Sequence, residues 1–421
     1  MTETFASNPA APRVARRHLG AHRGEAPGPL LLCIASLHGN EPSGSHATLR
    51  VIGQLAAAGP PMRGDLVALA GNLSALAAGA RFIDEDLNRV WQRGRVAAVL
   101  ESLRAEDTEA TTARPTPGGA SENPALPMVG TSELAEQRQL IASIREAVQD
   151  ARGPVYVLDL HTTSSESAPF TTLGDTLQNR ALARSLPVPV VLGLEEQIDG
   201  AMLQYFDLLG WAGIGIEAGA HDDPASIDAH TDVIWVLLAA LGLLDAEHVP
   251  DLERCRARLA RAAADLPRVV DVRYRHPVSS EDGFVMNPGF RNFERVRKGQ
   301  VLGSDRMGPV AAPTGGRLFL PLYQKQGDDG FFVVRRVRPV WLAISRWLRR
   351  RGLDRRATWI PGVIPHPDRT DAVVLARWAT NGVVIGILHL LGFNARHEKG
   401  RVVLIRRVES AANGGPLDLR H

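Results

Sequence analysis

Short apolar runs that close on polar residues recur along the first half of the chain. The run LLLCIAS at residues 30–36 is apolar at nearly every position, which is typical of a strand buried on both faces of a sheet. Similar runs lie at residues 65–70, 155–160 and 213–217. Helical stretches separate them, at about residues 44–58, 132–149 and 179–186. Strands that alternate with helices in this way predict an open α/β sheet with flanking helices.

The pattern changes near residue 265. Between about residues 268 and 338, short β-rich runs such as GFVMNPG and GQVLGSD are broken by glycine, which predicts a small all-β domain. Residues 108–130, rich in Thr, Pro, Gly and Ala, predict a long inserted loop. We therefore expect a first domain over residues 1–265, a small β domain over residues 266–338 and a basic C-terminal extension over residues 339–421.

The C-terminal extension opens with WLAISRWLRRRGLDRR, which predicts an amphipathic helix. Trp341, Ile344 and Leu348 fall on one face of this helix. Its basic face carries Arg346, Arg349, Arg350 and Arg351. We interpret the basic face as a solvated surface of a helix packed on the body of the protein. A patch for a membrane surface or for nucleic acid stays open as the alternative.

Charge and composition narrow the class of protein. The 48 Lys and Arg against 46 Asp and Glu leave a net charge of +2, so no nucleic-acid partner is expected for the whole chain. The longest apolar runs, Val233–Leu244 and Val383–Phe393, are shorter than the roughly 18–20 residues of a membrane span. The N-terminal residues lack the apolar stretch of a secretory signal, and two cysteines form no disulfide framework. We expect a cytoplasmic protein without a transmembrane segment.

Polar residues with metal-binding side chains stand at the ends of the predicted strands. His38 and Glu41 follow the first run, His161 ends the run at residues 155–160, and Glu217 ends the run at residues 213–217. The carboxyl ends of parallel strands meet at one edge of a sheet, where ligands bind. Two imidazoles and one carboxylate are a common ligand set for zinc in hydrolases. His38, Glu41 and His161 therefore predict a zinc site.

Four segments carry a resemblance to a known family. HGNE at residues 38–41, NLSALAAGARFIDEDLNRVW at 72–91, DLHTTS at 159–164 and IEAG at 216–219 resemble the aspartoacylase and succinylglutamate desuccinylase family. That family belongs to the zinc carboxypeptidase-like superfamily. The resemblance covers about residues 30–219, and the β-rich segment resembles the family's small C-terminal domain. It implies an open mixed α/β sheet with flanking helices, to which this chain adds a basic tail.

The resemblance also implies how the metal site works. His38, Glu41 and His161 match the ligands of one Zn²⁺ per chain. Glu217 matches the general base that deprotonates the metal-bound water and later protonates the leaving amine. Arg81 matches the arginine that polarises the scissile carbonyl and stabilises the oxyanion.

Further residues are implied to bind the substrate or to support the ligands. Asn88 and Arg89 match the pair that holds a substrate carboxylate, for which a guanidinium fork is suited. Asp86 and Asp159 are candidates for orienting the zinc histidines, and the sequence does not assign either aspartate to either histidine.

The chain departs from the family pattern where a second substrate carboxylate would bind. The resemblance implies a further arginine about ten residues before Glu217, but Asp207 stands there and no arginine lies between Leu203 and Glu217. Tyr323 does not match the spacing of the family's substrate-contacting tyrosine, so we leave it out of the site. These differences argue against dicarboxylate substrates. The residues Tyr205, Phe206, Asp207 and Trp211 suggest instead a pocket for a neutral, apolar or cationic group.

Together these features predict a zinc metallohydrolase that cleaves a C–N bond other than a peptide bond. Its expected substrate is a small N-acyl amino acid or a related compound with a carboxylate. Two alternatives stay open: a carboxypeptidase-like hydrolase of peptides or cell-wall fragments, and a zinc-binding interaction protein that acts through its basic tail. A homo-oligomer also stays open.

Overall fold

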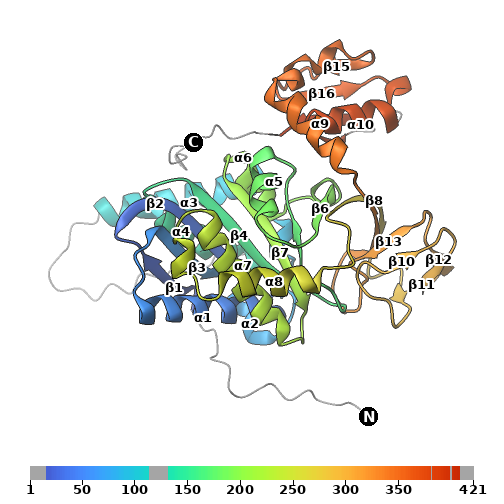
Figure 1. Ribbon diagram of the computed structural model, residues 1–421. Helices are drawn as coiled ribbons and strands as arrows, with labels where there is room; N and C mark the ends of the chain where they lie inside the picture. The colour runs from blue at the N-terminus through green and yellow to red at the C-terminus, as the bar shows by residue number, and fades with distance from the viewer. Residues whose placement is uncertain (1–15, 113–130, 381, 399–400, 408–421) are drawn as a thin grey trace.

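One large mixed sheet forms the body of the protein. The computed structural model describes residues 16–112, 131–380, 382–398 and 401–407 (Figure 1). In sheet order the eleven strands are β1 (His18–Arg23), β3 (Arg63–Ala70), β2 (Ala26–Ala35), β4 (Val155–Thr163), β7 (Ala212–Ala220), β5 (Phe170–Thr172), β6 (Val190–Leu192), β8 (Val269–Pro277), β14 (Asp329–Arg336), β13 (Gly316–Phe319) and β10 (Arg295–Val296).

The centre of the sheet is parallel and buried on both faces. Strand β2 pairs in parallel with β3 and β4, and β4 pairs in parallel with β7, whereas β1 and β5 are antiparallel to their neighbours β3 and β7. Side chains alternate along a strand. In β2, Leu31 and Cys33 accordingly enter one core, while Leu32 and Ile34 enter the other. The predicted open mixed α/β sheet is confirmed.

Helices cover both faces of this sheet. On the face of Leu31 they are α1 (Ser43–Ala58), α5 (Leu177–Arg184), α7 (Ala225–Ala240) and α8 (Leu252–Ala262). On the face of Ile34 they are α3 (Arg93–Thr112), α4 (Ser132–Gln149) and α6 (Met202–Leu208). The short helix α2 (Leu73–Ala78) follows β3 and packs beside the loop that follows β2. The helix predicted at residues 132–149 matches α4.

The β-rich segment after residue 268 contains the predicted small strands, and part of it extends the main sheet. Strands β8, β14, β13 and β10 continue the large sheet beyond β6. A separate three-stranded sheet contains β12 (Gly308–Ala311), β11 (Val301–Asp305) and β9 (Val285–Met286). The division into domains at residues 265 and 338 stays a prediction.

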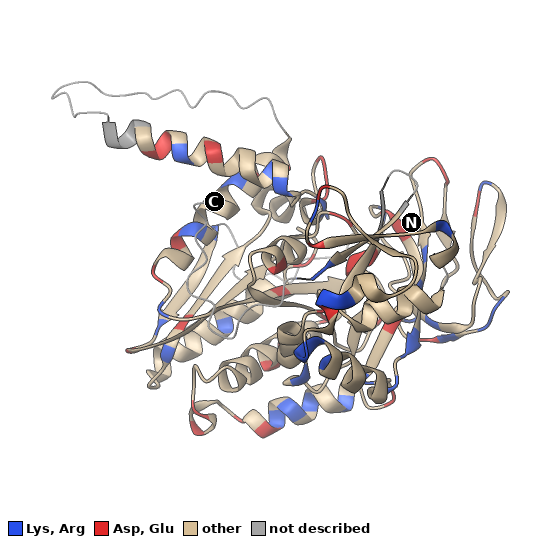
Figure 2. Cartoon of the chain, turned by 90° about the horizontal axis from the view of Figure 1, so that it is seen from above, with Lys and Arg blue, Asp and Glu red and all other residues tan. Residues whose placement is uncertain are grey.

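The C-terminal extension has its own small sheet and apolar core. Its elements are α9 (Pro339–Arg350), β15 (Val363–Pro365), β16 (Ala372–Leu375), α10 (Gly382–Leu390), β17 (Phe393–Glu398) and β18 (Arg401–Arg406), and the sheet order is β15-β16-β18-β17. Of the arginines placed on the basic face of α9, Arg350 and Arg351 are exposed. Arg349 is buried because it contacts Asp175 of the main body, which corrects the solvated position expected for it. Lys and Arg are otherwise interspersed with Asp and Glu over the chain (Figure 2).

Two further expectations concern loops and membrane spans. Helix α3 continues to Thr112, so residues 108–112 of the predicted inserted loop are helical, and residues 113–130 lie outside the described residues. Among the helices described here, none combines the length and the apolar character needed to cross a bilayer.

Candidate metal centre and pocket

The loop after β2 presents His38 and Glu41 at the carboxyl edge of the sheet. Ser36 turns the chain with a φ of 52°, and its hydroxyl lies 2.7 Å from the hydroxyl of Ser45. Gly39 packs against α2 so closely that a Cβ atom would lie 2.0 Å from the carbonyl carbon of Ala75. A side chain at this position would push the loop outward. The glycine of HGNE thus lets His38 and Glu41 point back over the sheet.

Strands β4 and β7 bring His161 and Glu217 to the same edge. His161 is paired in register with Glu217, and this pairing continues with a shift to Thr163 and Ala220. Both residues therefore lie inside their strands, whereas the apolar runs predict them at strand ends. The strands are longer than expected because this backbone pairing continues past the apolar runs.

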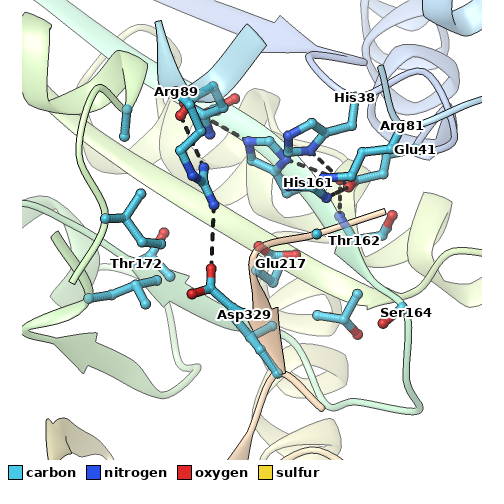
Figure 3. Close-up of a pocket in the computed structure, with 18 of the residues that line it drawn as sticks. His38, Glu41, Arg81, Arg89, His161, Thr162, Ser164, Thr172, Glu217 and Asp329 are labelled. Atoms are coloured by element: carbon cyan, nitrogen blue, oxygen red, sulfur yellow. Dashed lines mark hydrogen bonds and ion pairs between the residues drawn. The ribbon is translucent and has the colours of Figure 1, made fainter. Parts of the chain in front are cut away.

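His38, Glu41 and His161 converge in one buried cluster (Figure 3). The Nδ1 atom of His38 lies 2.9 Å from Oε1 of Glu41, and Nδ1 of His161 lies 3.1 Å from Oε2. One ligand atom from each residue falls within 4.8 Å of the others. The three residues are only 3%, 2% and 7% exposed. A compact set of two imidazoles and one carboxylate fits a zinc ion that keeps a further position open.

Each imidazole of this cluster also contacts an aspartate through its other nitrogen. Nε2 of His38 lies 3.0 Å from Oδ1 of Asp86, and Nε2 of His161 lies 3.0 Å from Oδ2 of Asp159. The contact of His38 is a hydrogen bond and favours the tautomer whose Nδ1 is free to bind a metal, whereas the contact of His161 is a close ion pair. The structure thus assigns Asp86 to His38 and Asp159 to His161, a choice that the sequence left open.

Arg81 lies beside the metal cluster and is itself held in place. Its Nη2 atom lies 3.0 Å from Oδ2 of Asp86, and its Nη1 atom lies 3.5 Å from Oε1 of Glu41. Burial opposes the charge of Arg81, but Asp86 and Glu41 outweigh it and raise the pKa of the guanidinium. Arg81 is therefore a fixed cation at the wall of the pocket.

Asn88 and Arg89 also line the pocket, from the short helix η1 (Leu87–Arg89) that follows Asp86. The amide oxygen of Asn88 accepts a hydrogen bond of 2.8 Å from the backbone N–H of Met202, which leaves the amide nitrogen for a ligand. Arg89 Nη1 donates to the carbonyl oxygen of Asn88 at 3.0 Å, and its Nη2 lies 3.6 Å from Oδ2 of Asp329. Asp329 was not among the residues selected from the sequence.

Glu217 lines the same pocket and is half-buried. Its Oε2 atom is buried and makes no hydrogen bond with any described residue. Burial raises the pKa of Glu217 to about 8, with His161 opposing this rise. A carboxylate that is shielded from water and has an oxygen without a hydrogen bond to the protein is suited to exchange a proton with a bound molecule.

The pocket has a polar side at the metal cluster and an apolar side opposite. Its volume is about 170 Å³. The apolar side is lined by Leu173, Leu194, Ile198, Leu203, Leu322 and Phe332. The polar lining residues that the sequence did not indicate include His221, which lies 2.7 Å from the hydroxyl of Thr162, and Gln324 of the β-rich segment, which lies 3.2 Å from His221. His221 stands four residues after Glu217 and could have been noticed, whereas no local pattern marks Gln324.

The residues around Asp207 do not form the pocket suggested from the sequence. Among the described residues that line it, Tyr205, Phe206, Asp207 and Trp211 are absent. Phe206 stacks on Trp211 at 5.3 Å between ring centroids, within the core beneath α6. Asp207 accepts a hydrogen bond of 2.7 Å from Asn179. Tyr323, left out of the predicted site, also does not line the pocket, and its hydroxyl donates to the carbonyl of Asn287 at 2.7 Å.

Comparisons with known proteins agree with the motifs. Residues 27–116 match the succinylglutamate desuccinylase/aspartoacylase catalytic domain. The matched range contains His38 and Arg89 but ends before His161 and Glu217. The chain is 34% identical over 85 residues to a succinylglutamate desuccinylase of Burkholderia cenocepacia, a match that spans 20% of this chain and only 24% of the relative.

Solved structures resemble this fold over more of its length. A succinylglutamate desuccinylase/aspartoacylase from Rhodobacter sphaeroides superposes with a TM-score of 0.51 at 18% identity, covering 76% of this chain and 88% of its own. The succinylglutamate desuccinylase of Chromobacterium violaceum gives 0.47 at 19% identity, covering 75% and 86%. At these identities the superposition supports the fold alone. The resemblance of this chain to the succinylglutamate desuccinylase/aspartoacylase family is confirmed by the sequence matches, which cover its N-terminal part.

Proposed function

We propose that the protein is a zinc-dependent hydrolase that cleaves the amide bond of an N-acyl amino acid or a related compound with a carboxylate. The observation that supports this most is the convergence of His38, Glu41 and His161, with each imidazole backed by its own aspartate. Four carboxylates, Glu41, Asp86, Asp159 and Glu217, lie around the two imidazoles, and the guanidinium of Arg81 contacts Glu41 and Asp86. A buried group with this acidic excess fits a divalent cation.

When bound, zinc would lower the pKa of a water and polarise the substrate carbonyl. Glu217 would accept one proton from the attacking water and return it to the amine nitrogen as the C–N bond breaks, giving a carboxylate and an amine. Arg81 would stabilise the negative charge that develops on the carbonyl oxygen. Arg89 and the amide nitrogen of Asn88 would hold the substrate carboxylate.

The decisive experiment combines metal analysis with amine release from a panel of N-acyl amino acids. We expect about one zinc per chain and turnover of at least one compound. Glu217→Gln should retain zinc but lower turnover roughly 100-fold or more, because general-base catalysis contributes about that much. Undiminished turnover in Glu217→Gln would exclude this role. Peptides and cell-wall fragments in the same panel test the carboxypeptidase-like alternative, and metal binding without any turnover would favour an interaction protein.

A further inference from the structure

Arg89 is not a free cation in the pocket. Its Nη2 atom lies 3.6 Å from Oδ2 of Asp329, and its Nη1 atom lies 4.0 Å from Oδ2 of Asp86. Figure 3 shows Asp329 extending from its strand towards Arg89. The guanidinium proposed to hold the substrate carboxylate thus already faces a carboxylate from the β-rich segment.

Asp329 is fixed in this position by contacts that leave one oxygen for Arg89. It is the first residue of β14, and its backbone is paired with Pro277 of β8. Arg275 Nε donates to its Oδ1 atom at 2.5 Å, while Arg275 Nη1 donates to the carbonyl of Gln197 at 2.6 Å. The side chain of Asp329 is 14% exposed, so water screens its interaction with Arg89 less than it would at the surface.

The rest of the pocket adds negative charge without a second guanidinium for substrate. Six carboxylates line it: Glu41, Asp159, Glu195, Glu217, Asp328 and Asp329, of which Glu195 is paired with Arg407 and Asp328 is exposed. The described lining contains two arginines, Arg81 and Arg89, and Arg81 is bound to Asp86 and Glu41. A first substrate carboxylate can share Arg89. A second substrate carboxylate would lie near carboxylates of the pocket and not near a cation. The repulsion would lower the affinity for substrates with two carboxylates, and repulsion of this kind contributes to specificity.

We propose that Asp329 is a specificity-determining residue. By sharing Arg89, it limits the site to acyl amides with a single carboxylate and disfavours those with two. This rests on the proposed hydrolase function. Unlike Asp207, which lies outside the pocket, Asp329 faces the group that would bind the substrate.

The test compares N-acetyl-L-alanine, with one carboxylate, and N-acetyl-L-aspartate, with two. In Asp329→Asn the isosteric amide keeps an oxygen for Arg275 and removes the charge opposite Arg89. We expect kcat/KM for the diacid, relative to the monoacid, to rise about tenfold through a lower KM, as expected when one close like-charge contact is removed. Asp328→Asn is the matched control, because its side chain is exposed and forms no ion pair with a described residue. It should change the ratio much less.

Binding to the Glu217→Gln protein, measured by calorimetry with and without Asp329→Asn, separates this inference from the hydrolase function. If the wild-type protein hydrolyses no acyl amide, the proposed function fails while the binding ratio still tests Asp329. The role of Asp329 would be overturned if Asp329→Asn left the preference for diacid over monoacid unchanged in both turnover and binding. It would also be overturned if Asp328→Asn raised this preference equally. If Asp329→Asn does not fold, Asp329→Ser removes the same charge and takes its place.

Discussion

Two of the buried groups of charged side chains in the described part of the chain differ in how their charges balance. The metal cluster of His38, Glu41 and His161, taken together with Asp86, Asp159, Glu217 and Arg81 beside it, has more acidic than basic groups. The Arg407 cluster joins the C-terminal extension to the main body. It pairs three carboxylates with three guanidiniums, those of Asp175, Glu195, Glu196, Arg180, Arg349 and Arg407.

In the Arg407 cluster the carboxylates are paired with guanidiniums of the same protein. Arg407 Nη2 donates to Glu195 at 2.7 Å and to Glu196 at 3.0 Å, and Arg180 Nη2 donates to Asp175 at 2.6 Å. Every carboxylate thus has a guanidinium within the protein. Beside the metal cluster, the Oε2 atom of Glu217 makes no hydrogen bond with any described residue, and both imidazole Nδ1 atoms face one glutamate. Burial and a shifted pKa alone therefore do not mark a functional site, whereas a buried donor set with excess negative charge fits a bound cation.

The largest expected effect on stability is in the Arg407 cluster. Arg407→Met leaves Glu195, Glu196 and Asp175 short of one buried cation, and breaking such a pair costs about 3–5 kcal/mol. We expect this loss in the free energy of unfolding, measured by urea denaturation, with unchanged zinc content. The adjacent Arg406 pairs with Asp354 inside the extension and is 36% exposed, so Arg406→Met should cost about 0–1 kcal/mol. Equal unfolding curves for the two variants would refute a structural role for the Arg407 cluster.

Sequence reasoning found one of these clusters and missed the other. His38 and Glu41 stand in one short motif, and His161 and Glu217 follow apolar runs whose parallel pairing can be inferred. No sequence motif indicates that Arg349 or Arg407 is buried. A helix with several successive arginines does not reveal which of them turns inward, because that depends on where the extension docks.

Some residues that line the pocket likewise could not be predicted from local sequence patterns. Gln324 lies 284 positions after Asn40, with which it forms a hydrogen bond of 3.1 Å. Asp329 reaches Arg89 because β14 continues the sheet beyond β8. These contacts depend on the tertiary arrangement of the β-rich segment. The sequence therefore indicated the proposed metal ligands together with Arg81, Asn88 and Arg89, but not Gln324 and Asp329, which line the same pocket.

A smaller effect is expected on zinc affinity. Asp159→Asn removes the carboxylate that contacts Nε2 of His161 and makes the imidazole a weaker ligand, and loss of such a support typically lowers metal affinity about 10–100-fold. Competition with a fluorescent zinc chelator measures this. Asp175→Asn is the matched control from the Arg407 cluster, and it should lower stability while leaving zinc affinity unchanged. Equal zinc affinity in wild type and Asp159→Asn would show that Asp159 does not support the metal site.

The smallest effect is a pH dependence of stability that arises in the Arg407 cluster. Burial raises the pKa of Glu195 to about 7, Arg407 opposes the rise, and Glu196 and Asp175 add to it. Since the folded protein holds this proton more tightly than the unfolded chain, the contribution of Glu195 to stability is complete below its unfolded pKa of 4.5 and is lost as pH rises through about 7. Glu195→Gln keeps an oxygen for Arg407 but cannot ionise. Its free energy of unfolding should therefore fall less than that of the wild type between pH 5 and 8, and parallel curves over this range would show that Glu195 does not titrate there.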